Sequence, residues 1–313
     1  MWGDSSVVEN GGSREGRRLI LVRPAGFCGG VKRATELFRH LREQMDPQEP
    51  LFVLHEVVHN STVTEKMLCR GAIFVDSPVE IPDGAQLLLG AHGTPLETLA
   101  QCRERDITCH DATCPRVAAL QEEILSLPPG LPVILLGDGH HPEVRGLMSR
   151  MGDRACHLLA DPEEARELSW LPEAALFCQT TRDEKELAEL RRLLAKRVGR
   201  LEDHAAVCES VALRQRIFAC VARNCDRVYV LGSSHSANAR RLLEVGRRNC
   251  SGEAYLVENA EELSEEEFDF ARTVGLVTAT STPDDVIGFT LEKFQRMGFQ
   301  LEEATREETE EGK

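Results

Sequence analysis

The chain has 313 residues, of which 42% are hydrophobic and 28% are charged, and its formal net charge is −15. This length and composition fit a globular protein with a sizeable core and two or three domains. The negative charge disfavours non-specific binding to nucleic acid, which needs a basic surface, but it allows a small anionic ligand.

The ends of the chain and its apolar segments give no sign of export or membrane insertion. No apolar run approaches the roughly 20 residues that a membrane-spanning helix needs. Residues 1–18 lack the apolar core of a signal peptide, and we predict that they form a disordered tail, like the acidic end EEATREETEEGK. Eleven cysteines without a secreted spacing pattern favour a reducing compartment. We therefore expect a cytoplasmic protein in which some thiols bind metal.

Short apolar runs alternate with amphipathic stretches along most of the chain, which is typical of an α/β fold. The predicted strands are 17–22, 50–55, 72–75, 85–91, 131–137, 156–160, 174–179, 227–232, 254–257 and 273–279. The predicted helices are 31–45, 116–127, 184–198 and 210–224, with a further helix in the C-terminal segment 293–313.

One pattern occurs three times. Cys28, Cys114 and Cys208 each follow a strand-like segment and precede a helix, at steps of 86 and 94 residues. A strand and a polar turn come after each helix, and a second pair of strands ends in another polar segment. The first polar segments are HEVVHN (55–60), DGHHPEV (138–144) and SSHSANAR (233–240). The second are AHGT (91–94), CQTT (178–181) and TATST (278–282).

The repeat predicts a closed trefoil of three α/β units related by a pseudo-threefold axis. Ligands bind at strand ends in α/β sheets, so three thiols and six polar loops would surround one central cavity. Solenoid repeats are shorter, roughly 20 to 50 residues, which disfavours an extended array. The expected divisions are the tail 1–18, units at 19–112, 113–206 and 207–292, and a C-terminal helix and acidic tail at 293–313.

Three thiolates from distant loops indicate a metal centre. All-thiolate coordination favours zinc or an iron–sulfur cluster. Structural zinc and most clusters take four protein ligands, so three cysteines would leave one position open, which in a four-iron cluster could bind a substrate oxygen. The spacing leaves both alternatives open. Most of the other eight cysteines are expected to be buried, inert thiols.

The polar loops are rich in hydroxyl, amide and imidazole groups, which can hold a diphosphate beside strand-to-helix turns. Any one such residue more often caps a helix or forms a turn, but repetition in six loops favours binding. The candidates are His59, Asn60, His92, Thr94, His141, Gln179, Thr180, Thr181, Ser234, Ser236, Asn238 and Ser281. Glu143 follows His141 and Pro142, and a nearby anion and cluster would favour its protonated form, which suits a proton donor.

Eight segments resemble the 4-hydroxy-3-methylbut-2-enyl diphosphate reductase (LytB) family, in order and with similar spacing, from about residue 19 to about 290. They are GFCGGVKRA, HEVVHN, AHGTP, DATCPRV, GHHPEV, QTT, GSSHSAN and TSTP. The resemblance implies a trefoil around one [4Fe–4S] cluster with three cysteine ligands and one open iron. It also implies reductive dehydroxylation of the allylic diphosphate to isopentenyl and dimethylallyl diphosphate in non-mevalonate isoprene biosynthesis, with electrons from ferredoxin or flavodoxin.

The same resemblance assigns roles by position. The implied cluster ligands are Cys28, Cys114 and Cys208. The implied catalytic residues are Glu143, which delivers a proton, Thr180, beside the substrate hydroxyl, and His141. The expected substrate-binding residues are His59, Asn60, His92, His141, Thr180, Ser234, Ser236, Asn238 and Ser281.

Several positions depart from the family pattern and keep two alternatives open. Ala237 stands where a second serine is common, and Cys178 replaces a threonine. Other departures are Asp138, His140, Cys109 and His110. The alternatives are a paralogous reductase of another small anion and a non-catalytic iron–sulfur sensor. Glu143 argues against the sensor, because a sensor has no use for a proton donor.

Overall fold

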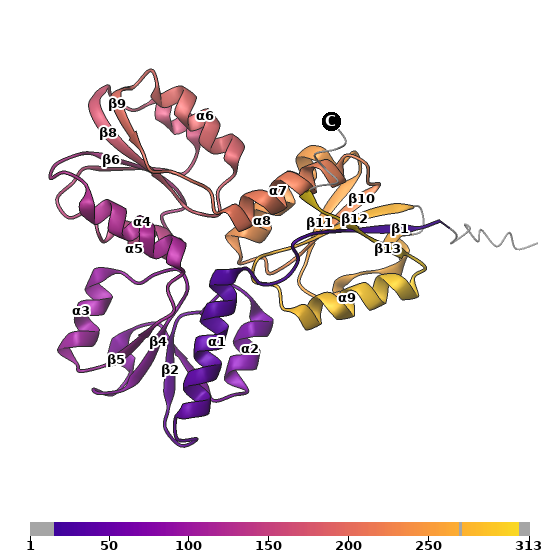
Figure 1. The fold of residues 1–313 in the computed structure, drawn as a ribbon, viewed down its shortest axis with the longest axis horizontal. Coiled ribbons are helices and arrows are strands. Elements are labelled where there is room, and N and C mark those ends of the chain that lie inside the picture. The colour runs from indigo at the N-terminus through magenta and orange to yellow at the C-terminus, as the bar shows by residue number, and fades with distance from the viewer. Residues whose placement is uncertain (1–15, 269–270, 307–313) are drawn as a thin grey trace, which may run out of the picture.

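Three lobes surround a common centre in the computed structural model, which describes residues 16–268 and 271–306 (Figure 1). Each lobe contains one parallel sheet with helices packed on it. The strand orders are β3-β2-β4-β5, β7-β6-β8-β9 and β11-β10-β12-β1-β13. The expected α/β trefoil is therefore confirmed.

The strands are β1 (Arg18–Val22), β2 (Leu51–Leu54), β3 (Ala72–Val75), β4 (Gln86–Leu89), β5 (Thr108–Asp111), β6 (Val133–Leu136), β7 (Cys156–Leu159), β8 (Leu171–Cys178), β9 (Val198–Asp203), β10 (Arg227–Leu231), β11 (Glu253–Val257), β12 (Thr273–Thr278) and β13 (Gln300–Ala304). The α-helices are α1 (Gly29–Gln44), α2 (Ser61–Leu68), α3 (Leu96–Glu104), α4 (Pro115–Ser126), α5 (Pro142–Met148), α6 (Glu184–Leu194), α7 (Glu209–Ala222), α8 (Ala237–Asn249) and α9 (Asp284–Arg296). Among these, the longest is α1, and no helix of the described residues has the length and apolar character to span a bilayer.

Each sheet is buried on both faces, which explains its continuous apolar strands. In β2, Leu51 and Val53 pack against α1 and α2, whereas Phe52 and Leu54 pack on the opposite face with Cys102 of α3. The other two sheets likewise have one apolar cluster on each face. Because both faces are covered, the exposed chemistry is confined to the strand ends.

Each of the three cysteines lies at a crossing between two lobes. The strand before the cysteine belongs to one lobe, and the helix after it belongs to the next. β5 pairs with β4 and leads to Cys114, and β9 pairs with β8 and leads to Cys208. By the same rule, β1 leads to Cys28 but pairs with β12 and β13 of the last sheet. The expectation that the first unit begins at residue 19 is therefore wrong for β1. This pairing joins the two ends of the trefoil.

Every predicted strand overlaps an observed strand, and the four named helices overlap α1, α4, α6 and α7. Three strands were not predicted, of which β5 (TCHD) and β9 (VGRLED) are largely polar, and β13 (QLEEA) is charged and mostly exposed. The helix predicted for 184–198 ends at Leu194 because β9 begins at Val198. Four further helices were not predicted: α2 and α3 begin just after polar segments, and α5 and α8 begin within them.

The ends of the chain require two corrections. The predicted tail 1–18 lies mostly outside the described residues, but Arg18 begins β1 and Arg17 is buried, with its guanidinium donating to Met297 O at 3.2 Å. The C-terminal helix predicted for 293–313 is wrong, because α9 spans Asp284–Arg296 and β13 follows it. The acidic tail falls largely in residues 307–313, outside the described part.

Candidate active site and metal centre

Cys28, Cys114 and Cys208 occupy equivalent positions in the three lobes. Each is the N-cap residue of a helix, respectively α1, α4 and α7, and none caps its helix through the side chain. All three line one central cavity of about 100 Å³. The helix N-termini place partial positive charge beside the sulfur atoms, which favours thiolates and anionic ligands.

The lobes approach closely at the cysteines. A Cβ atom at Gly30 would lie 2.7 Å from Cys114 Sγ and 3.9 Å from Cys28 Sγ. The first distance is shorter than any ordinary contact, so a larger residue would displace the thiol of the neighbouring lobe. The absence of a side chain at Gly30 therefore leaves space beside the sulfur atoms for a group bound by the cysteines.

Arg214 of α7 places a buried cation beside two of the cysteines. Its side chain is 1% exposed, and it donates to Ser210 O at 2.8 Å and to Gly26 O at 2.7 Å. Burial lowers its pKa, and the charges of Cys28 and Cys208 act in the opposite direction. Its Nε has no hydrogen-bond partner. Arg214 was not among the residues predicted from the sequence, where its only signal is a charge on the apolar face of a predicted helix.

The geometry fits a multi-atom cluster better than zinc. In the described residues, the only group of three or more metal-binding side chains with ligand atoms within 4.8 Å of one another is His59, His92 and His141. The three sulfur atoms therefore do not all lie within 4.8 Å of one another, whereas a single zinc ion with Zn–S bonds of about 2.3 Å requires sulfurs less than about 4 Å apart. An iron–sulfur cluster is larger than one ion and carries negative charge, and three features of the cavity fit it. The thiols are spread apart, Gly30 leaves space beside them, and the Nε–H of the Arg214 cation has no partner.

Three histidines converge beside the cysteines. The rings of His59 and His92 stack at 4.3 Å, and His141 meets them edge-on at 5.4 and 5.3 Å. Burial lowers the pKa of His92 well below its usual value and that of His141 to about 4, so both are neutral at pH 7. His141 Nδ1 accepts a hydrogen bond from Glu143 N at 3.2 Å, which leaves the proton on Nε2 as a donor.

Glu143 is buried at the start of α5 and lines the cysteine cavity. Its carboxylate receives two hydrogen bonds from Thr180, from the backbone N at 2.6 Å and from Oγ1 at 2.8 Å. Burial raises the pKa of Glu143 to about 7, although the Thr180 hydrogen bonds act in the opposite direction. The group can therefore hold or release a proton near neutral pH.

Polar side chains from the third lobe complete the cavity. Ser236 is the N-cap of α8, where its Oγ accepts from Ala239 N at 3.3 Å. Asn238 is 2% exposed, donates to Thr280 Oγ1 at 3.4 Å and has an Oδ1 without a partner. Ser281 donates to His59 O at 3.2 Å, joining the third lobe to the first. All of these line the cavity with Thr180 and Thr181.

Four expected residues lie elsewhere. Asn60 and Ser234 do not line the cavity, because Asn60 Oδ1 caps α2 by accepting from Val63 N, and Ser234 Oγ donates to Glu258. Thr94 lines a separate cleft, and Gln179 contacts Asp138 N and Thr181 instead. Polar residues in the predicted binding loops can thus serve as helix caps or as hydrogen-bonding partners within a lobe, without reaching the cavity.

The departures from the family pattern also separate in space. Cys178 is fully buried in the apolar core of the second lobe, and burial raises the pKa of its thiol to about 12. Ala237 lines the cavity. His110 lies in β5, where Nε2 contacts Gln86 Oε1 at 2.7 Å. Only Ala237 among these three is placed to affect a ligand.

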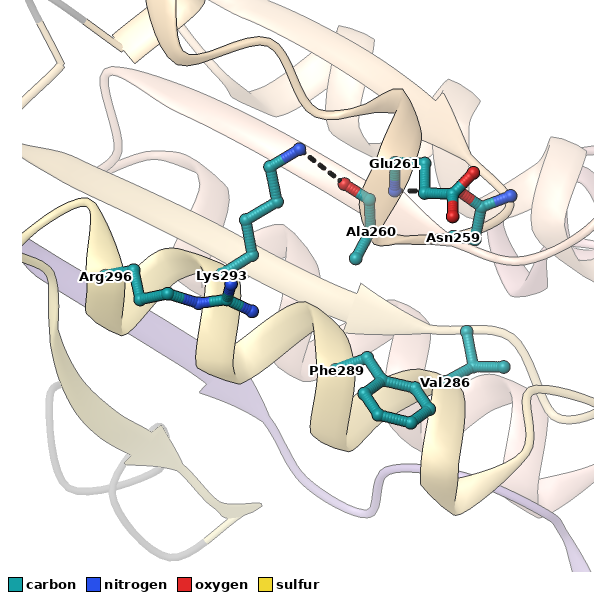
Figure 2. Close-up of a pocket in the computed structure, with 7 residues that line it drawn as sticks. All are labelled: Asn259, Ala260, Glu261, Val286, Phe289, Lys293 and Arg296. Atoms are coloured by element: carbon teal, nitrogen blue, oxygen red, sulfur yellow. Dashed lines mark hydrogen bonds between the residues drawn. The ribbon is translucent and has the colours of Figure 1, made fainter.

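A larger cavity of about 540 Å³ lies on the third lobe between α9 and the segment after β11 (Figure 2). It is lined by Asn259, Ala260, Glu261, Val286, Phe289, Lys293 and Arg296. Lys293 Nζ donates to Ala260 O at 2.8 Å, so its charge is partly engaged within the lobe. None of the predicted site residues lies there, and the chemistry is concentrated in the smaller central cavity.

Comparison with known proteins relates the chain to one family. A family model described as LytB protein matches residues 19–295. The chain is 32% identical over 290 residues to a 4-hydroxy-3-methylbut-2-enyl diphosphate reductase from Sodalis glossinidius, with 90% of each chain covered. It is 33% identical over 293 residues to the enzyme of that name from Psychrobacter arcticus, with 91% of each covered.

Solved structures of similar proteins have the same fold. The E-1-hydroxy-2-methyl-but-2-enyl-4-diphosphate reductase from Plasmodium falciparum superposes with a TM-score of 0.84 at 25% identity, over 92% of both chains. An (E)-4-hydroxy-3-methyl-but-2-enyl diphosphate reductase, described as the terminal enzyme of the non-mevalonate pathway, gives a TM-score of 0.64 at 28% identity, over 90% of this chain and 99% of that one.

Proposed function

The chain belongs to the LytB protein family, and we propose on that basis that it reduces 4-hydroxy-3-methylbut-2-enyl diphosphate to isopentenyl and dimethylallyl diphosphate. The reaction consumes two electrons and two protons, cleaves the C–O bond of the allylic alcohol and releases water. The observation that carries the proposal is one cavity in which three N-cap cysteines meet the buried Glu143–Thr180 pair.

Cys28, Cys114 and Cys208 are the residues that would hold a [4Fe–4S] cluster, with one iron left without a protein ligand. When bound, such a cluster supplies electrons and a Lewis-acidic iron with an open coordination position. Arg214, buried in α7, would offset the negative charge of such a cluster. The three helix N-termini contribute in the same direction.

Glu143 is the proposed general acid. Its raised pKa keeps a large fraction protonated at neutral pH, and its position in the cavity lets it protonate the departing hydroxyl. Thr180 holds both carboxylate oxygens and so fixes the direction of proton transfer. His141 Nε2–H is a further donor on the same side, because its Nδ1 is engaged by Glu143 N.

The diphosphate is proposed to bind among His59, His92, Ser236, Asn238 and Ser281, which line the cavity. Hydrogen-bond donors in a buried site bind an anion by directed hydrogen bonds. Asn238 and Ser281 come from the third lobe and the histidines from the first. Binding would therefore bring the lobes together around the substrate.

We further infer that electrons come from ferredoxin or flavodoxin and that the protein is cytoplasmic. All eleven cysteines are free in the structure, which suits a reducing compartment. The described helices include none that would cross a membrane.

The deciding experiment is anaerobic purification followed by a reductase assay on 4-hydroxy-3-methylbut-2-enyl diphosphate with dithionite and a viologen. We expect substrate-dependent oxidation of the viologen and both isomeric products. A protein that carries the cluster and binds other small anions, but gives no turnover with this substrate, would support the paralogous reductase. A cluster-loaded protein that turns over none of them would support the sensor.

A further inference from the structure

His59 and His92 stand between two hollows. Both line the central cavity with the cysteines, and both also line a separate cleft of about 550 Å³. Glu56 lines this cleft but not the central cavity, and its side chain is 40% exposed, whereas that of His59 is 18% exposed. A proton from solvent can therefore reach Glu56 without passing through the substrate cavity.

The contact between Glu56 and His59 fixes the tautomer of the ring. Glu56 Oε2 lies 3.1 Å from His59 Nδ1, and an ionised carboxylate only accepts hydrogen bonds, so Nδ1 carries the proton. The other nitrogen, Nε2, is then a bare acceptor in the neutral ring. It is buried and has no hydrogen-bond partner.

A bare acceptor is unsuited to a diphosphate, whose oxygens are also acceptors. His141 has no such difficulty, because Glu143 N donates to its Nδ1 and leaves a proton on Nε2. His59 must gain a proton before Nε2 can donate. The carboxylate behind it would balance the resulting positive charge.

We infer that His59 takes up a proton when the diphosphate binds and holds the anion as an imidazolium, with Glu56 as the positioning residue that stabilises this form. The inference rests on the proposed function, because it concerns the proposed diphosphate site. It assigns Glu56 a role in binding that depends on its charge. Proton uptake also makes the affinity fall as pH rises, by roughly tenfold per pH unit where uptake is complete.

The surrounding groups disfavour a charge on the other two histidine rings. His92 and His141 face it at 4.3 and 5.4 Å, and burial disfavours the charged form of both. Asp138 acts on His141 in the opposite direction, but its pKa is still only about 4. The cleft also contains His55, Asp76 and Arg145, and Asp76 contacts His55 at 3.3 Å.

The test is calorimetric titration of the anaerobically prepared, cluster-loaded protein with inorganic diphosphate. Titrations in two buffers of different ionisation enthalpy give the number of protons taken up. The titrations are run near neutral pH, where any proton that diphosphate itself exchanges is common to the unaltered protein and its variants, so the difference in uptake between them reports on His59. We expect net uptake of up to about one proton per site in the unaltered protein.

Glu56→Gln keeps an oxygen that can accept from Nδ1–H but removes the charge. We expect less than half the proton uptake and at least about tenfold weaker binding at this pH, with Glu56→Asp restoring part of both. Simple Coulomb repulsion predicts the opposite, because removing an acidic group near an anion should tighten binding. Asp76→Asn is the matched control: it removes another carboxylate of the same cleft, bound to His55, and should leave proton uptake unchanged.

The outcomes separate the two proposals. Diphosphate binding without proton uptake, or unchanged uptake with equal or tighter binding in Glu56→Gln, would overturn the role of Glu56 and His59 and leave the proposed function standing. An unaltered, cluster-loaded protein that binds no diphosphate would overturn the proposed function and this inference with it.

Discussion

Glu143 of the second lobe is held at both carboxylate oxygens by one residue, Thr180. The backbone N of Thr180 donates to Oε1 at 2.6 Å and its Oγ1 donates to Oε2 at 2.8 Å. Thr180 follows β8 and Glu143 lies in the first turn of α5, so the pair joins the two polar segments of one lobe. A carboxyl group fixed at both oxygens and kept from water is pre-positioned for proton transfer.

Glu143→Gln should retain the cluster spectrum and substrate binding, because the amide has the same shape and no charge. Turnover should fall by at least about 10²-fold if Glu143 is the general acid. The measurement is the reductase assay beside a substrate titration of the cluster spectrum. Near-normal turnover would remove Glu143 from the mechanism.

The raised pKa of Glu143 also predicts a pH dependence. A proton donor with a pKa of about 7 loses its proton as pH rises through that value, so kcat should fall on the alkaline side. A bound diphosphate adds negative charge, which should raise the pKa of Glu143 and shift the fall in kcat to higher pH. The kcat profile measured at saturating substrate tests this, and a rise in kcat with pH across neutrality would contradict it.

The raised pKa of Glu143 also predicts that the free energy of unfolding falls as pH rises. The folded-state pKa of Glu143 is about 7 and its ordinary value is 4.5, so the folded state binds the proton more tightly. Its favourable contribution is therefore complete below about pH 4.5 and is lost as pH rises through about 7. Glu143→Gln should remove this part of the pH dependence of the free energy of unfolding, measured by denaturant titration of the apoprotein. An unchanged pH dependence would show that folding does not raise the pKa of Glu143.

The anaerobically purified protein should be brown and contain about four irons per chain. Changing Cys28, Cys114 or Cys208 to Ser should each bleach it, because every thiolate is a proposed ligand. Cys69→Ser and Cys250→Ser are the controls and should keep the colour, since neither residue lines the cavity. One zinc per chain, or a colourless protein after anaerobic reconstitution, would refute the cluster.

Asn238→Ala tests the diphosphate cradle. A hydrogen bond to a charged acceptor contributes about 1.5–3 kcal/mol, and 1.4 kcal/mol is a factor of ten, so binding should weaken roughly tenfold or more. Ala237→Ser, which adds a hydroxyl at the cavity wall, should tighten binding or leave it unchanged. The change in the cluster spectrum on substrate addition measures both. Equal binding by Asn238→Ala would mean that these loops do not hold the diphosphate.

Arg214 should set the reduction potential of the cluster. A fixed positive charge favours the more negative, reduced state, so Arg214→Met should shift the potential to more negative values and Arg214→Lys should shift it less. The control is Arg216→Met on the same helix, where the charge is exposed and paired with Glu184 and Glu209. A spectroelectrochemical titration measures the potential. Equal potentials in the Met and Lys variants would show that the charge has no such effect.

Local pattern was enough to predict many of the residues that line the central cavity. The residues before and after Cys28, Cys114 and Cys208 repeat strand, thiol and helix, and such elements are specified by nearby apolar spacing and turn residues. The same pattern identified Glu143 and the histidine loops. It could not separate a ligand from a helix cap, so Asn60 and Ser234 were grouped with residues that do reach the cavity.

What the sequence by itself determined is the threefold order of strands, helices, thiols and polar loops, because these depend on residues within one or two turns of each other. Tertiary structure alone decided that β1 closes the last sheet and that the charged segment β13 becomes a strand beside it, since pairing over about 280 residues leaves no local pattern. It also decided which donors face the cavity. Arg214 reaches Gly26 O, 188 residues away in the sequence, only because the folded lobes set these groups side by side, and burial then strengthens the electrostatic effect of its charge.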